Sequence, residues 1–442
     1  MPKKEKIVKV KNKSALNSFQ APKGMRDVLP MDQLWWDRIE KTAKELADFY
    51  NFGRIDTPIL EPAELFQRTV GVDSDIVEKE MYVLKTKSGN LLAMRPEGTA
   101  SVARAYLEHG MSKMGQPQKL YYIGPMFRHE NPQFGRLRQF SQVGFEIIGA
   151  LNDSIYDAQI ILLFDRLLKN LKIKNVVLKL NSIGCRVCRP GYKKQLQNYY
   201  KNHEDGLCGD CKRRLKTNPL RLLDCKKEEC VKLKEKAPIF LDKLCASCTR
   251  HFKAVLEYLD EIGISYGLDN TLVRGLDYYS QTVFEFLAEG VDVGSLAGGG
   301  RYDYLMELIG GRITPAVGGA VSFERLIEVM KSQDVKLPVK STRKVFLIHV
   351  GDLAKKKSLK IVEELRAAGI VVAEALGKES IKSQLKVADK QKNLIALIFG
   401  QKEIFEESII IRDLHTGLQE TVLLSKMVSE IQRRWREKSE IN

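Results

Sequence analysis

The chain has 442 residues, of which 44% are hydrophobic, so it is long enough for two or three globular domains with substantial cores. Its formal net charge of +16 favours a polyanionic partner, although a merely soluble basic protein has the same property. No apolar run reaches the roughly 18 to 20 residues of a membrane span, and no apolar segment follows the lysine-rich start. We therefore expect a cytoplasmic protein in which residues 1–18 form a disordered basic tail.

Regular structure is predicted from residue 19 onward. Proline and glycine punctuate residues 19–30, and a helix pattern follows from Asp32 to Tyr50. The stretch 52–62 contains two prolines, which donate no hydrogen bond to a sheet, so it suits a sheet edge or a subunit boundary. Short strand patterns at 81–84 and 91–94 bracket a polar turn and predict a hairpin.

The segment RPEGT, residues 95–99, follows this hairpin and precedes a helix pattern at 100–107. Taken alone, it is typical of a helix N-terminus with Thr99 as the cap and no ligand.

The most informative stretch is GPMFRHENPQFGRLRQFSQVGFEIIG, residues 124–149. Aromatic and β-branched residues at 119–127 predict one strand, and polar and apolar residues alternate along a second strand that begins near Gln142. Arg128, with the polar face of the second strand, suits a charged ligand, because a guanidinium group matches a phosphate or a carboxylate. The alternative is a solvated hairpin with surface ion pairs.

This stretch resembles motif 2 of the class II aminoacyl-tRNA synthetases, and in detail it is similar to the histidyl-tRNA synthetases of bacterial type. The pattern fRxExPqxGRxRxFxQxGxExxG is long and gapless. Residues 52–62 resemble motif 1, which forms the dimer interface in this family, and residues 315–326 resemble motif 3, although most relatives have glycine where Ser322 stands. RGLDYY (274–279) and GSLAGGGRYD (294–303) resemble the two histidine signatures.

The resemblance implies a class II antiparallel-sheet catalytic core over residues 19–330, and a role for each matching residue. Arg274 and Arg128 would be catalytic, although a structural turn with a satisfied ion pair also explains Arg274. Histidine would be bound by Glu97, Gly98, Thr99, Gln142, Glu146, Tyr278, Tyr279 and Tyr302. ATP, with Mg²⁺, would be bound by Arg128, Glu130, Phe140 and Arg325, and the tRNA acceptor end by Gln133, Arg136 and Arg138.

All eight cysteines lie in a section of about residues 180–265, in four close pairs. A cytosolic chain disfavours disulfides, and the first two pairs, C-x2-C, nineteen residues, C-x2-C, have the spacing of a four-thiolate zinc site. The other two pairs would form a second site. Packed thiols without a metal are the alternative. The candidate ligands are Cys185, Cys188, Cys208, Cys211, Cys225, Cys230, Cys245 and Cys248.

The same section is strongly basic, because residues 186–236 contain fifteen Lys and Arg against seven Asp and Glu. The family carries an insertion here that leans over the tRNA acceptor arm, and the positive surplus suits phosphate contact. A solvated helical face is the alternative. None of the cysteines falls in a segment expected to touch histidine or ATP. We therefore expect metal loss to impair transfer to tRNA and to leave histidine activation largely intact.

After a polar linker at 331–342, strand and helix patterns alternate and predict a small α/β domain with a partly parallel sheet. In this position it resembles the family's anticodon-binding domain, residues 343–430, and 431–442 would be a tail. Strands are predicted at 345–350, 370–375 and 394–399, and helices at 353–368 and 379–391.

The expected protein is thus an α/β (α+β) homodimeric histidine–tRNA ligase that uses ATP and tRNA(His). Two alternatives stay open. One is a non-catalytic synthetase-like regulatory subunit of ATP phosphoribosyltransferase, although those relatives typically lose the signature arginines and the C-terminal domain. The other is a nucleic-acid-binding protein with an inactive synthetase core.

Overall fold

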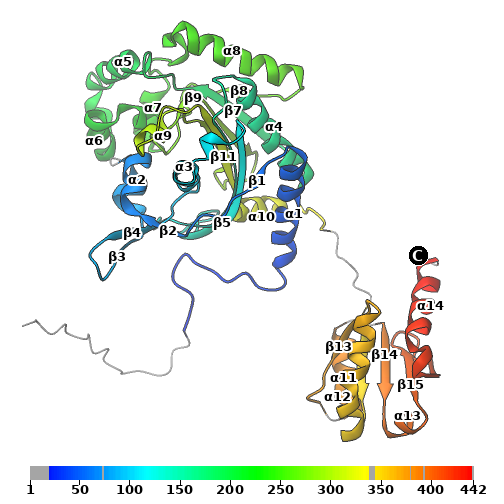
Figure 1. The fold of residues 1–442 in the computed structure, drawn as a ribbon. Coiled ribbons are helices and arrows are strands. Elements are labelled where there is room, and N and C mark those ends of the chain that lie inside the picture. The colour runs from blue at the N-terminus through cyan, green and yellow to red at the C-terminus, as the bar shows by residue number, and fades with distance from the viewer. Residues whose placement is uncertain (1–18, 72–73, 338–343, 379, 392–393, 441–442) are drawn as a thin grey trace, which may run out of the picture. The chain divides into compact units, whose positions relative to one another are not determined.

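The computed structural model divides the chain into two compact units, within residues 1–337 and 338–442 (Figure 1). Among the residues it describes, no helix is both long and apolar enough to cross a membrane. The predicted basic tail, 1–18, lies outside the described residues. The described residues are 19–71, 74–337, 344–378, 380–391 and 394–440.

The larger unit is organised by an eight-stranded sheet with the order β1-β5-β6-β11-β10-β9-β7-β8. Its central neighbours run antiparallel, and only the short edge strands β1 and β8 pair in parallel. The predicted strand pair around the polar loop is confirmed as β5 and β6. The strands are β1 (Gly53–Arg54), β5 (Gln118–Phe127), β6 (Gln139–Ile148), β7 (Val176–Ser182), β8 (Gly267–Leu268), β9 (Ser280–Ala288), β10 (Ser295–Arg301) and β11 (Ala316–Ser322).

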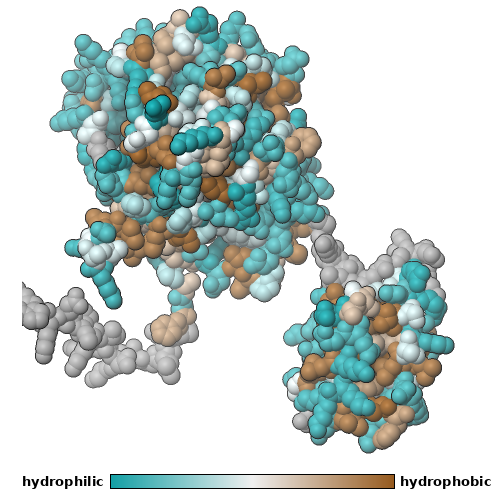
Figure 2. All heavy atoms as spheres, viewed as in Figure 1, coloured by the Kyte–Doolittle hydropathy of each residue, from teal (hydrophilic) through white to brown (hydrophobic). Residues whose placement is uncertain are grey.

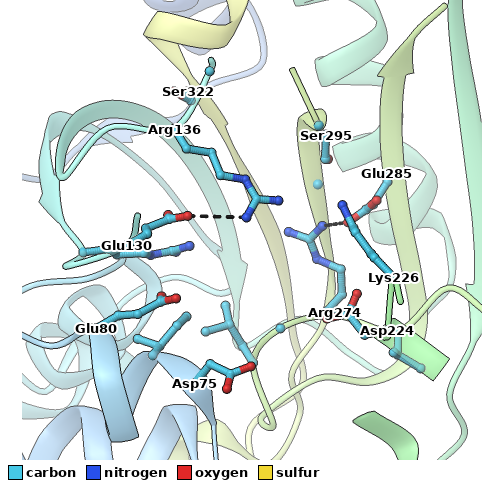
Figure 3. Close-up of a pocket in the computed structure, with 18 of the residues that line it drawn as sticks. Asp75, Glu80, Glu130, Arg136, Asp224, Lys226, Arg274, Glu285, Ser295 and Ser322 are labelled. Atoms are coloured by element: carbon cyan, nitrogen blue, oxygen red, sulfur yellow. Dashed lines mark hydrogen bonds and ion pairs between the residues drawn. The ribbon is translucent and has the colours of Figure 1, made fainter. Parts of the chain in front are cut away.

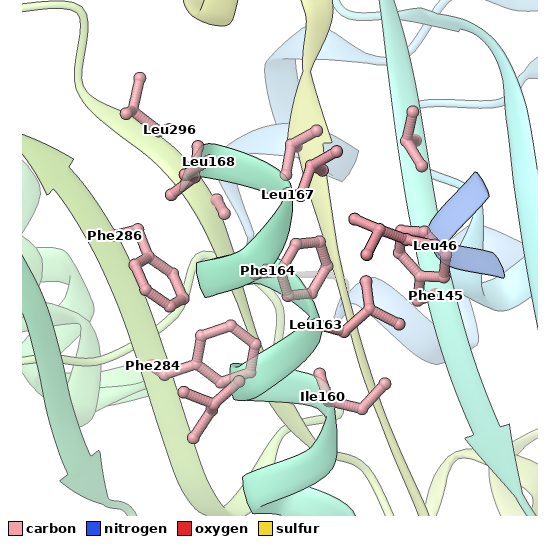
Figure 4. Close-up of a cluster of buried hydrophobic side chains, with 14 of the residues drawn as sticks. Leu46, Phe145, Ile160, Leu163, Phe164, Leu167, Leu168, Phe284, Phe286 and Leu296 are labelled. Atoms are coloured by element: carbon pink, nitrogen blue, oxygen red, sulfur yellow. The ribbon is translucent and has the colours of Figure 1, made fainter. Parts of the chain in front are cut away.

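One face of this sheet is covered by helices and is apolar. Successive side chains of a strand point to opposite faces, so the apolar residues of β6 enter this core while its polar residues face the other way. Phe164 on α4 lies between Phe145 on β6 and Phe284 on β9, with ring centroids 5.8 and 5.9 Å away (Figure 4). Burying one such ring contributes about 1.5–3 kcal/mol to the stability of the fold. The sheet is therefore a rigid support for a ligand on its other face. The main covering helices are α1 (Gln33–Phe49), α4 (Ile155–Asn170) and α10 (Phe323–Ser332).

The predicted hairpin is also confirmed, as β3 and β4, and it joins β2 in a three-stranded sheet. Helices α2 and α3 and the π-helical turn η1 lie beside this sheet (Figure 1). The bounds are β2 (Leu60–Pro62), β3 (Val83–Lys85), β4 (Leu91–Met94), α2 (Ala63–Val70), η1 (Ile76–Glu80), α3 (Thr99–Glu108), η2 (Met111–Lys113) and α9 (Leu305–Leu308).

The cysteine-rich section between β7 and β8 is a run of short helices. Only its first and last helices exceed ten residues. The elements are α5 (Arg189–Lys201), η3 (Glu204–Gly206), α6 (Gly209–Thr217), η4 (Pro219–Asp224), α7 (Glu228–Lys234), η5 (Leu241–Lys243) and α8 (Ala246–Glu261).

The smaller unit contains a five-stranded sheet, β13-β12-β14-β15-β16. Strands β12, β13 and β14 are parallel and the rest antiparallel, so the predicted partly parallel α/β domain is confirmed. The predicted tail is instead helical as far as Glu440, because Ile431 of α14 is buried in this unit's core. The elements are β12 (Lys344–His349), α11 (Asp352–Ala367), β13 (Val371–Glu374), α12 (Ile381–Lys390), β14 (Ile395–Phe399), α13 (Gln401–Phe405), β15 (Ser408–Asp413), β16 (Gln419–Leu423), η6 (Leu424–Lys426) and α14 (Met427–Glu440).

Candidate active site

A cavity of about 650 Å³ lies over the polar face of the large sheet. It is lined from motif 2, from the first histidine signature, from β9 and β10, and from the motif 3 helix α10. Arg136 and Arg274 extend into it from opposite sides (Figure 3). The fold thus brings together, as lining of one cavity, six of the residues predicted to act in catalysis or to bind histidine or ATP, namely Arg128, Glu130, Phe140, Gln142, Arg274 and Arg325.

Six arginines line this cavity, and burial together with the neighbouring positive charges acts on Arg325. Burial, together with the charges of Arg128 and Arg136, lowers the pKa of the Arg325 guanidinium to about 10. Arg325 is held in place because its Nε donates to the Gly135 carbonyl at 3.0 Å and its Nη1 to the Ser295 carbonyl at 2.7 Å. A guanidinium held in place in this way, with other arginines around it, favours a polyanionic ligand.

Arg274 is fixed by an ion pair rather than by the turn on which it lies. Its Nη1 donates to Oε1 of Glu285, and its guanidinium lies 5.8 Å from the ring centroid of Tyr279. Burial by itself lowers the pKa of Arg274, but the Glu285 carboxylate and the neighbouring tyrosines raise it above the ordinary value. A side chain at Gly298 would overlap this guanidinium, so the glycine of the second signature leaves room for it.

The ends of the motif 2 strands combine a cation, an acid and an aromatic ring. Arg128 donates from Nε to the Pro96 carbonyl at 2.9 Å and lies 5.4 Å from the centroid of the Phe140 ring. Glu130 Oε2 lies 3.5 Å from Nη1 of Arg136. An aromatic face beside charged groups has the chemistry to hold a heteroaromatic base next to its phosphates.

Most residues predicted to bind histidine form a buried polar cluster rather than lining the cavity. Glu146 accepts from Thr99 Oγ1 at 2.7 Å and from the Tyr302 hydroxyl at 2.5 Å, and the Tyr278 hydroxyl donates to Glu97 Oε2 at 3.3 Å. Burial raises the pKa of Glu146 to about 8. In this geometry the two carboxylates bind the protein's own hydroxyl groups.

Gln142 connects this buried cluster with the cavity, because it lies on the same face of β6 as Glu146 and lines the cavity. Its Oε1 is buried and has no hydrogen-bond partner among the described residues. A buried acceptor without a partner costs free energy, so this atom has the character of a ligand contact.

The segment RPEGT caps helix α3, but not through the expected residue. Thr99 is the first helical residue, and Glu97 accepts from the backbone N–H groups of Thr99 at 2.7 Å and Ala100 at 2.8 Å. Gly98 stands where a larger residue would overlap the Tyr122 ring. The structure therefore places Glu97, Gly98 and Thr99 together, with a capping role for Glu97 that leaves lone pairs on both of its oxygens.

Residues of the motif 2 loop lie in different surroundings, which the sequence did not indicate. Arg136 lines the cavity, whereas Gln133 is exposed and Arg138 is engaged with the Glu130 carbonyl at 3.1 Å. The three residues expected to contact tRNA therefore do not share one environment.

Two important residues were missed in the sequence. Glu285 is the charged residue of strand β9, where it lies between two phenylalanines, and this was the available signal for the partner of Arg274. Arg95 belongs to RPEGT and connects motif 1 to motif 2, because it donates to the Pro125 carbonyl at 3.0 Å and the Thr57 carbonyl at 2.8 Å. No spacing rule identifies a contact of that kind.

Comparison with known proteins gives this cavity its context. The family model for histidyl-tRNA synthetase matches residues 24–189 and 207–326, and a model for an anticodon binding domain matches residues 344–434. The chain belongs to the histidyl-tRNA synthetase family. The histidine–tRNA ligase of Halothermothrix orenii is 45% identical over 416 residues, which cover 94% of this chain and 99% of that protein.

Solved structures agree with membership of the histidyl-tRNA synthetase family. The crystal structure of apo S. aureus histidyl-tRNA synthetase has a TM-score of 0.78 and 34% identity, covering 94% of this chain and 100% of that one. The predicted class II fold is confirmed. A crystal structure of an ATP phosphoribosyltransferase regulatory subunit/histidyl-tRNA synthetase from Bacillus halodurans C covers 87% of this chain and 99% of that one. Its TM-score of 0.63 at 22% identity shows the fold alone.

Ser322, the departure from the family's motif 3, lines the cavity near the end of β11. Its hydroxyl donates to Oε2 of Glu324 at 2.8 Å, while Oε1 of Glu324 accepts from the backbone N–H of Ser141 at 2.9 Å. The extra hydroxyl thus joins a bond network that ties motif 3 to motif 2.

The eight cysteines of this histidyl-tRNA synthetase family member form two clusters, but the predicted pairing of sites is wrong. Within each cluster the sulfur atoms all lie within 4.8 Å of one another. Cys185 and Cys188 lie where the chain enters the insertion, and they contact Cys245 and Cys248, 60 positions later, where the chain leaves it. The first two C-x2-C pairs of the sequence therefore do not share a site. The junction cluster is Cys185, Cys188, Cys245 and Cys248, and the cavity cluster is Cys208, Cys211, Cys225 and Cys230.

Two of the cysteines reach the cavity, although none falls in a segment expected to touch histidine or ATP. Cys208 and Cys225 of the cavity cluster line the same cavity as Arg128 and Arg274. Their sequence segment lies outside every synthetase motif, but the insertion folds back over the cavity.

Proposed function

We propose that this protein is a histidine–tRNA ligase. It activates L-histidine with ATP to histidyl-adenylate, releasing pyrophosphate, and then passes histidine to the 3′ end of tRNA(His). The observation that carries the proposal is the convergence of the motif arginines Arg128, Arg274 and Arg325 in one cavity beside a buried pair of carboxylates. Family membership supports the same chemistry.

The first step is attack of a histidine carboxylate oxygen on the α-phosphate of ATP. The protein must hold two anions together and stabilise charge that develops at phosphorus, so alignment and fixed positive charge are its main contributions. Arg274 and Arg128 carry that role, since each is oriented by bonds to the protein itself. Arg325, at the other end of the arginine group, holds the departing phosphates.

Histidine binds through the buried polar cluster and Gln142. Its ammonium group replaces hydroxyl donors at Glu97 and Glu146 and donates to the unpartnered Oε1 of Gln142, with Gly98 and Thr99 shaping this end of the site. The rings of Tyr278, Tyr279 and Tyr302 are grouped, with centroid distances of 4.6 and 5.7 Å, and form a wall against the imidazole. Glu130 and Phe140 accommodate the adenine.

Mg²⁺ accompanies ATP, and the cavity offers carboxylates that fit it. Glu80 and Glu130 both line the cavity, and burial together with the charge of Glu130 raises the pKa of Glu80. Mg²⁺ is usually held by one or two carboxylates and by substrate phosphates, and it would shield phosphate charge from the incoming carboxylate.

Pyrophosphate exchange into ATP tests the proposal directly. The wild-type protein should catalyse exchange with histidine and with no other amino acid. A regulatory subunit, or a nucleic-acid-binding protein with an inactive core, would give no exchange with any amino acid. Charging of tRNA(His) by the same preparation then tests the second step.

The motif 2 loop separates the two steps. We expect Gln133→Ala to lower the rate of transfer to tRNA about tenfold with little change in exchange, because Gln133 is exposed and lies outside the cavity. Arg136→Ala should lower both rates, since Arg136 lines the cavity. Arg138 is expected to behave like Gln133. Single-turnover transfer from preformed adenylate, measured beside exchange, distinguishes them, and equal damage by Gln133→Ala to both steps would place the residue at the ATP site.

A homodimer is expected to form through the motif 1 side of the larger unit. Hydrophobic residues gather on this part of the surface, and Leu60, Val83, Leu84 and Leu91 are each about half exposed (Figure 2). Light scattering should give twice the mass of one chain, and Leu84→Glu should give a single-chain mass. Leu418→Glu, which changes a more exposed leucine of the other unit, is the control. The same mass for both variants would contradict this interface.

The eight cysteines are proposed ligands of structural Zn²⁺ in the insertion. No cysteine of the chain is in a disulfide, and each cluster supplies four thiols, the usual set of a structural zinc site. The insertion, with its basic surplus, contacts the acceptor arm of tRNA.

A further inference from the structure

The cavity cluster has the dimensions of a tetrahedral metal site. Four sulfur atoms bound at about 2.3 Å to one Zn²⁺ ion lie about 3.8 Å apart. In the structure, Cys208 and Cys225 Sγ are 4.0 Å apart, and all four sulfur atoms lie within 4.8 Å of one another. The backbone N–H of Cys208 donates to Cys230 Sγ at 3.3 Å, a bond that favours a thiolate. These separations are far longer than a disulfide bond.

Three short elements carry this cluster. Cys208 and Cys211 belong to the start of α6, Cys225 follows η4, and Cys230 lies in α7. All four cysteines are buried, in the same hydrophobic core as the leucines of these elements. Helices of this length are marginal in water by themselves, so a bound ion would add its binding free energy to that core.

The turn η4, which ends at the cluster, holds the first histidine signature. Its Arg221 is buried and donates from Nε and Nη2 to Asp277 Oδ1 at 3.2 and 3.0 Å, and from Nη2 to the Gly275 carbonyl at 2.7 Å. Asn218 adds a bond to the same Asp277 oxygen at 3.1 Å. Arg274 directly precedes Gly275 in the chain, so its position follows that of Arg221.

Helix α6, which begins at the cluster, reaches the opposite wall of the cavity. Arg214 pairs with Asp75, and Arg213 Nη2 lies 3.2 Å from Oε2 of Glu78, both beside η1. Asp75 and Glu80 line the cavity on that side (Figure 3). The cluster therefore lies between two sets of contacts that hold both walls of the cavity.

We infer that Zn²⁺ bound at the cavity cluster positions Arg221, and through Asp277 and Gly275 the catalytic Arg274, so that loss of this ion slows histidine activation itself. The inference rests on the proposed function. The junction cluster is connected less directly: none of its cysteines lines the cavity, and Arg189, which follows Cys188, donates to the Tyr279 carbonyl at 2.6 Å and not to Gly275 or Asp277. The two clusters thus have different roles: the junction cluster closes the insertion, and the cavity cluster supports the reaction.

Metal analysis of the full chain, purified in reducing, zinc-supplemented buffer, is the first test. We expect two zinc ions per chain, and one in each of two double variants, Cys225→Ser/Cys230→Ser for the cavity cluster and Cys245→Ser/Cys248→Ser for the junction cluster. Pyrophosphate exchange should fall tenfold or more in the cavity variant, and clearly less in the junction variant, because a displacement of about 1 Å at a reacting group can cost 10²-fold in rate. Equal losses would overturn the inference, as would wild-type protein that is free of metal.

Arg221 gives a second test that does not disturb the thiols. Arg221→Ala should keep both zinc ions and lower kcat for exchange about tenfold with a smaller change in the KM for ATP, and Arg221→Lys should restore part of the rate. Unchanged kcat in Arg221→Ala would overturn the positioning role, even if the cysteine variants fail to fold. Wild-type protein that holds two zinc ions but shows no histidine-dependent exchange would refute the proposed function, and the metal site would stand.

Discussion

Replacing Arg274 with alanine is expected to lower histidine-dependent pyrophosphate exchange by roughly 10²-fold or more, the usual cost of removing one oriented charge stabiliser. The guanidinium is held by Glu285 at the cavity, so the free protein already has it in place for the charge that develops at phosphorus. Histidine binding should weaken less than the rate, because the ammonium contacts belong to other residues. Arg274→Lys should be intermediate, since it keeps the charge but loses the fork.

The control is Arg312→Ala, which removes the same charge from an exposed position. Its exchange rate should equal that of the wild type. If folded Arg274→Ala protein, checked by circular dichroism and thermal unfolding, exchanges at the wild-type rate, Arg274 belongs to a structural turn and not to the mechanism.

Much of the fold could be predicted because its signals are local. The alternation of polar and apolar residues along β6 follows directly from the geometry of a strand. Changes in the spacing of apolar residues, from that of a helix to that of a strand, identified α1, the hairpin and the C-terminal α/β unit. The last helix was missed because a polar sequence hides one buried stripe, in which Met427 and Ile431 lie four positions apart. Charge dominates the composition of this helix, but packing decides its structure.

The cysteine pairing could not be predicted because it depends on the path of the chain. Spacing rules group neighbours, whereas the insertion begins and ends at the same place, so Cys185 lies 3.8 Å from Cys245 across 60 positions. The same argument applies to Arg221 and Asp277, whose contact joins the insertion to a synthetase signature. A sequence motif identifies the residues that meet a ligand, but it does not identify those that hold them in place.

The candidate site was predicted unevenly for a related reason. The motif arginines were found because each belongs to a recognisable pattern, and the cavity unites them. Side-chain geometry decides whether Glu97 and Glu146 already accept hydrogen bonds within the protein. Both accept them from hydroxyl groups of the protein. Histidine must replace these hydrogen bonds, so on binding its ammonium group takes the place of hydroxyl donors of the protein.

Arg325→Ala is the second change with a large expected effect. Arg128, Arg136 and Arg325 line one cavity, and burial, together with the repulsion from the other two arginines, lowers the pKa of Arg325 to about 10. A bound triphosphate relieves this repulsion. Arg325 should therefore stabilise bound ATP more than it stabilises the fold of the free protein. We expect kcat/KM for ATP in pyrophosphate exchange to fall by roughly 10²-fold, while the KM for histidine changes little, because a charge-assisted contact to phosphate is lost.

Arg325 also donates to the carbonyls of Gly135 and Ser295, so its loss could act by loosening the motif 2 loop instead. The two explanations differ in what ATP does for stability. If Arg325 binds phosphate, wild-type protein should gain thermal stability from ATP and Arg325→Ala should gain almost none, whereas Arg312→Ala should respond like the wild type. If ATP stabilises Arg325→Ala as strongly as the wild type, Arg325 does not bind phosphate, and its role is to hold the motif 2 loop against β10.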